Sequence, residues 1–317
     1  MEKKNVLITG VTSTLGRQVA TQLYFDKKIG TIIGTAIGEM PYYFEDFDKK
    51  RFIYKQTDIL KSRQLNNLFL SETFKEAKID TVIHLAFYSS YKNYDERHHQ
   101  LNVEGTKNLL DMCIENPLIR KFIFKSSHIV YQIKADNPVL LDEDSDLNFS
   151  KDADPWIRDR VDADMLCRSR MDSKRINIVL LRPTSIIGRN IHGSMNAYFD
   201  SPLVFKPMGY DPMINLIHVR DVVSAIQLAV HKNVKGVFNL MGKDTAPLSE
   251  FLRLNKSRTI SLPGPLIKPL NAITRKLGIT QYYYSVEAAI LHHSALLDDS
   301  KARRELGWEP KNHIRFG

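Results

Sequence analysis

A glycine-bearing turn near the N-terminus has the residues to hold phosphate groups. Residues 9–16 read TGVTSTLG and lie between an apolar, β-branched run and a helix-like segment. In that place Gly10 permits a tight turn, Gly16 permits close packing of helix on strand, and the helix N-terminus attracts anions. Ser13 stands where a third glycine would let the backbone approach a pyrophosphate, so we expect its Cβ to crowd that ligand. The turn predicts a dinucleotide site made by Gly10, Thr12, Ser13, Thr14, Leu15 and Gly16, with a βα turn that no longer binds dinucleotide as the alternative.

Further candidate site residues follow other β-like runs. Asp58 and Ile59 lie in QTDIL (56–60), Leu85, Ala86 and Phe87 in HLAF (84–87), and Ser127 and His128 in KSSHIVY (125–131). Because the carboxyl ends of parallel strands meet at one edge of a sheet, we expect these residues near Gly10. Residues on an extended strand alternate in direction, so we expect His128 to point away from Ser127 and to be structural. Asp58 could equally cap a helix that begins near Ser62.

The elements that must position these residues alternate along the chain. Runs rich in β-branched residues at 5–9, 31–36, 52–55, 81–85, 121–126 and 177–182 predict strands, and 15–26, 62–76, 99–115 and 156–173 predict helices. This alternation is typical of an α/β Rossmann fold, a doubly wound parallel sheet. We expect 214–219 and 222–231 to be a strand and helix that rejoin that sheet. The dinucleotide-binding domain would then be 1–182 with 214–244, and a small C-terminal substrate-binding lobe would be 183–213 with 245–317.

Several motifs together resemble the extended short-chain dehydrogenase/reductases, the family of NAD-dependent nucleotide-sugar epimerases and dehydratases. They are NVEGTKNLL at 102–110, RPTSIIG at 182–188, LIHVRDV at 216–222, GVFNL at 236–240 and LDDSKARRELGW at 297–308. The resemblance covers nearly the whole chain and implies NAD or NADP as cofactor. It adds to the cofactor site Ala36, Asp58, Ile59, Leu85, Ala86, Phe87 and Asn102. It implies Ser127 as the catalytic serine, and Ser127, His128, Pro183, Ser185 and Arg220 as substrate contacts. Neither the NAD-type acid nor an NADP-type arginine stands in register after Ala36.

The catalytic tyrosine and lysine of that family have no counterpart in this chain. Pro155 and Asp164 align the segment with the family's pattern, and this puts Trp156 and Arg160 at the two positions. An indole N–H donates a hydrogen bond but does not titrate usefully, and a guanidinium holds its proton too firmly to shuttle it. The resemblance leaves Arg160 only a cofactor-binding role.

Composition and charge indicate which kinds of ligand and which cellular location suit this chain. The first 150 residues carry 20 Lys+Arg against 20 Asp+Glu, and the others carry 25 against 16, so the later half holds the whole net charge of +9. This basic half suits a nucleotide sugar or another anionic small molecule, and no motif predicts nucleic-acid binding. Cys113 and Cys167 have no metal-ligand spacing, so we expect reduced buried thiols and no metal site. The absence of a signal peptide or apolar span predicts a cytoplasmic protein.

Three helix-like segments predict how the chain could contact a membrane or a second copy of itself. Residues 262–278 place Leu266, Leu270, Ile273 and Leu277 at helical spacing among Lys268, Arg275 and Lys276. Such a helix can lie on a membrane surface, but we expect its apolar stripe to pack on its own domain. The resemblance also implies a homodimer formed by helices 99–115 and 156–173.

These observations leave three hypotheses open. The first is a degenerate enzyme that binds a dinucleotide and acts in sensing, regulation or interaction. The second is an active NAD(P)-dependent epimerase, dehydratase or reductase with an unconventional acid/base. The third is a membrane-surface or protein-binding scaffold with an empty cleft.

Overall fold

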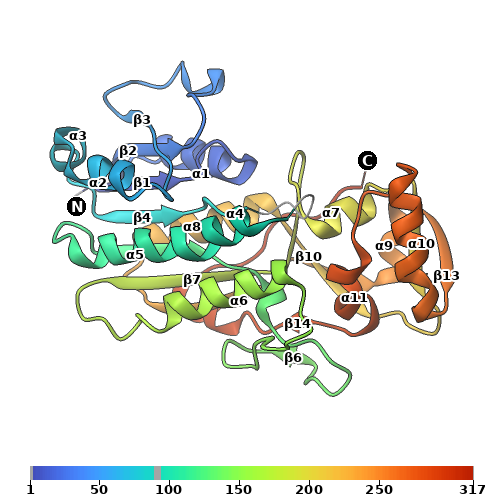
Figure 1. The fold of residues 1–317 in the computed structure, drawn as a ribbon. Helices are drawn as coiled ribbons and strands as arrows, with labels where there is room; N and C mark the ends of the chain where they lie inside the picture. The colour runs from blue at the N-terminus through green and yellow to red at the C-terminus, as the bar shows by residue number, and fades with distance from the viewer. Residues whose placement is uncertain (1–2, 89–93, 317) are drawn as a thin grey trace.

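A seven-stranded parallel sheet forms the centre of the molecule in the computed structural model, which describes residues 3–88 and 94–316 (Figure 1). Its strand order is β11-β7-β5-β4-β1-β2-β3. The strands are β1 (Lys4–Thr9), β2 (Ile29–Ala36), β3 (Phe52–Gln56), β4 (Thr81–His84), β5 (Lys121–Lys125), β7 (Asn177–Pro183) and β11 (Gly236–Leu240). The order reverses between β1 and β4, where a crevice forms at the carboxyl ends of the strands. The predicted α/β Rossmann fold is confirmed.

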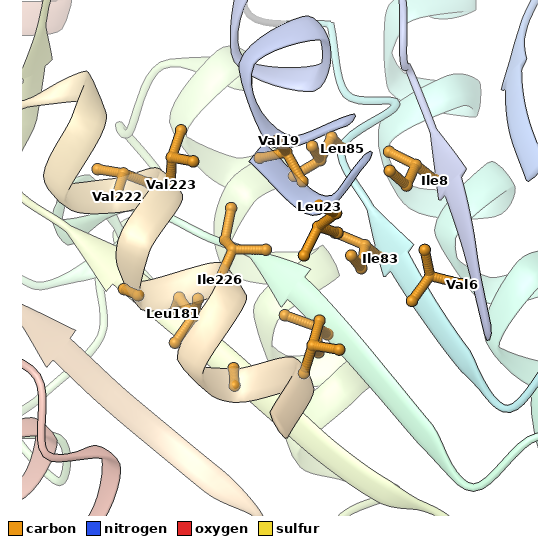
Figure 2. Close-up of a cluster of buried hydrophobic side chains, with 14 of the residues drawn as sticks. Val6, Ile8, Val19, Leu23, Ile83, Leu85, Leu181, Val222, Val223 and Ile226 are labelled. Carbon is orange, nitrogen blue, oxygen red and sulfur yellow. The ribbon is translucent and has the colours of Figure 1, made fainter. Parts of the chain in front are cut away.

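Helices cover both faces of this sheet. One face carries α1 (Thr14–Tyr24) and α8 (Val219–His231), and the other carries α2 (Ser62–Leu70), α3 (Glu72–Glu76), α5 (Thr106–Glu115) and α6 (Pro155–Arg168). Figure 2 shows Val19 and Leu23 of α1 and Val222, Val223 and Ile226 of α8 beside strand residues such as Ile8, Ile83 and Leu181. Alternation along each strand sends neighbours such as Leu7 to the opposite face. Cys113 and Cys167 are buried free thiols on that second face, as predicted.

Two predicted helices are interrupted. The segment 62–76 divides into α2 and α3 because Ser71 adopts an extended conformation and accepts a hydrogen bond from the Phe74 N–H as the N-cap of α3. The segment 99–115 begins earlier, as α4 (Glu96–His99), and passes through a π-helical stretch, Gln100–Gly105, before α5.

The strand predicted at 214–219 does not rejoin the main sheet. It is β10 (Met213–His218), which pairs with β8 (Ser185–Ile187) and β12 (Asp244–Pro247) in a separate three-stranded sheet. The outer place beside β7 is taken by β11, whose Val237, Phe238 and Leu240 are buried. Because β8 follows β7 after one residue, Thr184, and leads into the lobe, its partner β10 lies with the lobe. The helix that follows, α8, packs on the main sheet as predicted.

The C-terminal part supplies most of a second packed unit at the end of the sheet (Figure 1). It contains α7 (Ser194–Phe199), β9 (Leu203–Pro207), α9 (Leu248–Leu254), β13 (Arg258–Leu262), α10 (Gly264–Lys276) and α11 (Tyr284–His292). Two short strands, β6 (Leu140–Leu141) and β14 (Leu296–Leu297), pair with each other. None of the helices in the described ranges combines the length and apolar character that crossing a membrane requires.

The expectation that the apolar stripe of residues 262–278 packs on its own domain is wrong. Leu266, Ile273 and Leu277 are 50%, 53% and 67% exposed. The inward face of α10 carries Ile267 and Asn271 instead, and only Leu270 of the predicted stripe packs partly on the lobe core. Helix rotation is set by the side chains that find partners, and Asn271 finds its partners inside, in Thr280 and the Tyr284 N–H.

Candidate cofactor and substrate cleft

A cleft of about 440 Å³ opens where the crevice of the sheet meets the lobe. It brings together predicted residues from segments far apart in the chain. They are Thr12, Ser13, Thr14 and Leu15 of the turn, Leu85 and Phe87 after β4, Ser127 and His128 after β5, Trp156 and Arg160 of α6, and Pro183 and Ser185 of β7 and β8. Arg220 lines a second cavity, which shares Asn190, Ile191, His192 and Asn196 with the first.

At two positions of the turn after β1, Gly10 and Gly16, only glycine fits the backbone and its surroundings. Gly10 has a φ of +68°, and a Cβ there would stand 2.6 Å from the Ala86 nitrogen. A Cβ on Gly16 would overlap the Gly10 carbonyl oxygen. These two glycines therefore let the turn lie against β4 and let α1 pack onto the turn.

The Ser13 hydroxyl is directed back into the turn. Its oxygen accepts a hydrogen bond from the Gly16 N–H at 3.0 Å and donates one to the Gly10 carbonyl at 2.8 Å. Ser13 is thus the N-cap of α1, and only its Cβ adds bulk beside the helix N-terminus. The Thr14 hydroxyl donates to the Asn190 carbonyl at 2.6 Å, which joins the turn to the segment after β8.

Seven predicted cofactor residues lie outside the lining of the cleft: Gly10, Gly16 and Ala86 at the turn, and Ala36, Asp58, Ile59 and Asn102 further away. Ala36 and Ile59 are buried next to the ends of β2 and β3, and Asp58 accepts a hydrogen bond from the Leu60 N–H at 3.1 Å. That bond forms a local turn, and the N-cap of α2 is Lys61 rather than Asp58. Asn102 is fully buried, where it accepts from the Tyr88 N–H at 2.7 Å and donates to Asp159 at 3.2 Å.

His84, the last residue of β4, is a neutral structural group. Its ring nitrogens contact the hydroxyls of Thr9 at 2.8 Å and Thr106 at 2.9 Å. Complete burial, with a smaller effect from Lys125, lowers the pKa of His84 to about 3, so the ring is uncharged at neutral pH. These bonds tie the ends of β1 and β4 to α5 beneath the cleft.

Ser127 and His128 line the same cleft, contrary to the expectation from strand alternation. The strand β5 ends at Lys125, and His128–Val130 form a 3-10 turn with Ser127 as its N-cap. The His128 Nδ1–H donates to the Pro183 carbonyl at 3.2 Å. Burial lowers the pKa of His128 to about 4, which keeps its ring neutral and supports the structural role predicted for it.

Lys125 is a cleft residue that sequence reasoning missed. It is half-buried at the carboxyl end of β5 and lines the cleft with Ser127 and Arg160. Burial, and then the positive charge of Arg160, lower the pKa of Lys125 to about 8. Its one available signal was a lysine at the end of an apolar strand, next to the two serines.

Trp156 and Arg160 contact each other, one helical turn apart on α6. The guanidinium carbon of Arg160 lies 3.2 Å from the centre of the Trp156 ring and 5.0 Å from that of Phe87. Its Nη1 donates to the Trp156 carbonyl at 2.9 Å. Burial lowers the pKa of Arg160 to about 9, so the side chain stays protonated at neutral pH. The pair forms a cation–π stack.

Comparison with known proteins identifies the family of this chain. Residues 6–240 match the model of the NAD dependent epimerase/dehydratase family. The chain belongs to this family. The family's description names NAD, which confirms the predicted cofactor class, and the match confirms the resemblance found in the sequence motifs.

Relatives of this epimerase/dehydratase chain span nearly its full length. An uncharacterized protein of Mycobacterium tuberculosis is 26% identical over 97% of this chain and 80% of its own. The dTDP-glucose 4,6-dehydratase of Bacillus anthracis, solved in complex with NAD, superposes with a TM-score of 0.71 at 16% identity, covering 99% of this chain and 94% of that one. The UDP-glucuronic acid 4-epimerase of Bacillus cereus, with UDP-glucuronic acid and NAD, gives 0.67 at 18% identity, covering 98% and 95%.

Other motif residues of this epimerase/dehydratase chain meet in a buried network below the cleft. Arg182 pairs with Asp164 at 2.5 Å, and both side chains are fully buried. Arg182 also donates to the Tyr131 hydroxyl at 2.8 Å, which donates to Asn239 at 2.6 Å, and Ser126 donates to Asp164 at 2.5 Å. This network joins β5, α6, β7 and β11 and fixes the strand ends that carry the cleft.

Proposed function

We propose that the protein binds NAD or NADP in the cleft between the turn after β1 and the end of β5. Bound there, it would serve in sensing, regulation or interaction rather than in conventional epimerase or dehydratase chemistry. The turn supports this proposal because Gly10, Gly16 and the N-terminus of α1 retain the backbone arrangement that suits a pyrophosphate. The nicotinamide ring of such a cofactor would supply hydride chemistry when bound.

The stacking of Arg160 on Trp156 carries the proposal. Family chemistry needs a group that exchanges a proton near neutral pH. At these two positions the chain offers an indole and a guanidinium that remains charged, and they contact each other. Both side chains can enclose a ligand, but the indole does not titrate usefully and the guanidinium stays protonated at neutral pH.

The second cavity supports an anionic ligand. Arg189, Arg220, Lys311 and Arg315 line it, whereas Asp200 is its single acid within the described ranges. A nucleotide sugar or another anionic small molecule would therefore meet a positive surface there.

A homodimer through α5 and α6 remains a prediction. Three apolar residues of α6 are already buried in the chain's own core, namely Trp156, Ile157 and Val161.

Calorimetric titration of a Ser13→Asp variant with NAD and NADP, oxidised and reduced, tests the binding proposal. Aspartate preserves the N-cap of α1 but adds a negative charge where the pyrophosphate would lie, so we expect dinucleotide binding to be lost. Ser71→Asp is the matched control, because Ser71 caps α3 with the same pattern of bonds, to Phe74 N–H and Leu68 carbonyl. Absence of binding by the wild-type protein at millimolar dinucleotide, or equal binding by the Ser13→Asp variant, contradicts the proposal.

Lys125 favours a second candidate function, an active NAD(P)-dependent enzyme with an unconventional acid/base. Its amine lines the cleft beside Ser127, and its pKa of about 8 allows proton exchange near neutral pH. As a neutral amine it could take up the proton of a substrate hydroxyl whose carbon gives up a hydride. Ser127 would then orient that hydroxyl.

A pH profile of turnover in the Lys125→Met variant separates the two candidates. The second candidate predicts NAD(P)-linked oxidation that rises through about pH 8 as the amine loses its proton, and that Lys125→Met abolishes. Lys61→Met, an exposed lysine of the same size outside the cleft, is the control. Turnover that Lys125→Met leaves unchanged excludes Lys125 as the acid/base.

A further inference from the structure

The carboxyl end of β2 is open at the place where a bound dinucleotide would put its adenosine ribose. In a Rossmann crevice an acid at this strand end accepts a hydrogen bond from the 2′-hydroxyl of NAD, whereas an arginine nearby accommodates the 2′-phosphate of NADP. Here β2 ends at Ala36, and Ile37 and Gly38 follow before the first acid, Glu39. Ile37 is 65% exposed, and a Cβ on Gly38 would meet no atom within 4 Å. The strand end therefore has room for a phosphate and carries no carboxylate directly on it.

A cation reaches this edge of the sheet from α1. Arg17 lies in the first turn of α1, directly after Gly16, and its side chain is exposed. Its guanidinium carbon lies 4.1 Å from the centre of the Tyr43 ring. Tyr43 belongs to a 3-10 turn, Tyr42–Phe44, in the segment that follows β2. Arg17 therefore joins the start of α1 to the segment after β2.

Hydrogen bonds hold the Tyr43 ring between the turn after β1 and the end of β2. The Tyr43 hydroxyl donates to the Thr12 carbonyl at 3.2 Å, and the Tyr54 hydroxyl donates to the Gly38 carbonyl at 2.5 Å. Burial, and then the neighbouring Tyr43 hydroxyl, raise the pKa of Tyr54. These contacts connect Thr12 with Gly38 through two adjacent phenols. Arg17, stacked on the first of them, lies between the places where the pyrophosphate and the adenosine ribose would bind.

The N–H groups of Arg17 are available to a ligand. Within residues 3–88 and 94–316, no carboxylate forms an ion pair with its guanidinium. Stacking covers a face of the guanidinium, whereas its N–H groups lie in the plane and suit phosphate oxygens. Arg51 gives a contrast, because it lies over Tyr24 at 4.9 Å but also donates to the Ile29 carbonyl at 3.2 Å. The stack of Arg51 is structural, while that of Arg17 orients a cation toward the open strand end.

We propose that the cleft selects NADP over NAD, and that Arg17 makes this selection by contacting the 2′-phosphate of the adenosine ribose. The inference rests on the proposed function, because it specifies which dinucleotide the cleft takes. Tyr43 holds the guanidinium in place, so that less conformational entropy is lost when the phosphate binds. NAD carries a hydroxyl at that position and forfeits the charge-assisted contact.

Calorimetric titration of the full chain with NADP and with NAD tests the role of Arg17. We expect NADP to bind at least about tenfold more tightly than NAD. Arg17→Met should lower NADP binding to the level of NAD and leave NAD binding unchanged. Arg120→Met is the matched control, because it removes an exposed arginine just before β5, at the opposite edge of the sheet. The unfolding temperature of both variants is expected to match that of the wild type, since both side chains are exposed.

Two substitutions of Tyr43 test whether the ring positions Arg17. Tyr43→Phe keeps the ring and should keep the ratio of NADP to NAD affinity, whereas Tyr43→Leu removes the ring and should lower that ratio. A purely structural role would lower both affinities together and leave the ratio unchanged in Tyr43→Leu. That result would overturn the role given to Tyr43.

The outcomes separate this inference from the proposed function. Equal affinity for the two dinucleotides, or tighter binding of NAD, overturns the assignment of Arg17 and leaves dinucleotide binding by the cleft intact. An equal loss of NADP and NAD binding in Arg17→Met would place Arg17 at the pyrophosphate and would also overturn it. Binding of neither dinucleotide by the wild-type protein contradicts the proposed function itself, and the assignment of Arg17 falls with it.

Discussion

The two ends of the cleft differ in what their function depends on. At the turn after β1, anion binding depends on the backbone, and the shape that it needs is kept by Gly10 and Gly16 although Ser13 replaces a glycine. Beside α6, proton transfer would depend on side-chain chemistry, and there Arg160 stacks on Trp156, the arrangement on which the proposed loss of conventional chemistry rests. The comparison teaches that the backbone end can be judged from geometry alone, whereas the α6 end has to be tested by its chemistry.

The buried network below the α6 end gives the largest expected effect. Asp164→Ala would leave Arg182 buried without its carboxylate, which is expected to cost about 3–5 kcal/mol of unfolding free energy. Asp111→Ala is the control, since its pairs with Lys107 and Arg170 are partly exposed and contribute about 0–1 kcal/mol. Denaturant unfolding of both variants measures the difference. Equal losses of unfolding free energy would mean that the buried network around Asp164 stabilises the protein no more than a surface ion pair does.

A glycine series probes the backbone end of the cleft. Gly38→Ala meets open space and should change the unfolding free energy by less than about 0.5 kcal/mol. Gly209→Ala adds left-handed strain in open space, about 1–2 kcal/mol. Gly10→Ala adds the same strain and a clash with the backbone of Ala86, so it should exceed Gly209→Ala. If Gly10→Ala and Gly209→Ala cost the same, the turn is not held against β4 as described.

Local pattern predicted the sheet because its strands are buried on both faces and read as apolar runs. The same pattern misplaced β10, since residues 214–219 look alike whether they pair with β7 or with β8. It also predicted the wrong buried face for α10, because hydrophobic spacing cannot show that Asn271 has buried hydrogen-bond partners.

At the site, the motifs predicted roles for Ser127, Trp156 and Arg160, which the structure brings together in one cleft. They could not show that the 3-10 turn after β5 brings His128 into the same cleft, nor that Lys125 lies beside Arg160. Both depend on contacts between segments that are distant in the chain. Spacing within one segment carries no information about them.

The smallest expected effect belongs to Ser13→Gly, which restores the glycine at the turn. Removing the Cβ lets the backbone approach a pyrophosphate, so we expect dinucleotide to bind several-fold more tightly. Loss of the N-cap should cost only a few tenths of a kcal/mol, because glycine is itself tolerated at that position. Titration calorimetry and thermal unfolding of the same sample measure both. Weaker binding would show that the Ser13 hydroxyl helps the ligand rather than crowding it.

Turnover of NAD(P)H by the wild-type protein with nucleotide sugars tests most directly whether the cleft binds without conventional chemistry. We expect a rate no higher than background, since a site without a general acid/base lacks a contribution of about 10²–10⁴-fold. Trp156→Tyr with Arg160→Lys should fold, because the network around Asp164 and Arg182 remains, and should gain measurable turnover. Rapid turnover by the unmodified protein, unaffected by Trp156→Phe, would contradict this expectation. It would show that another residue transfers the proton.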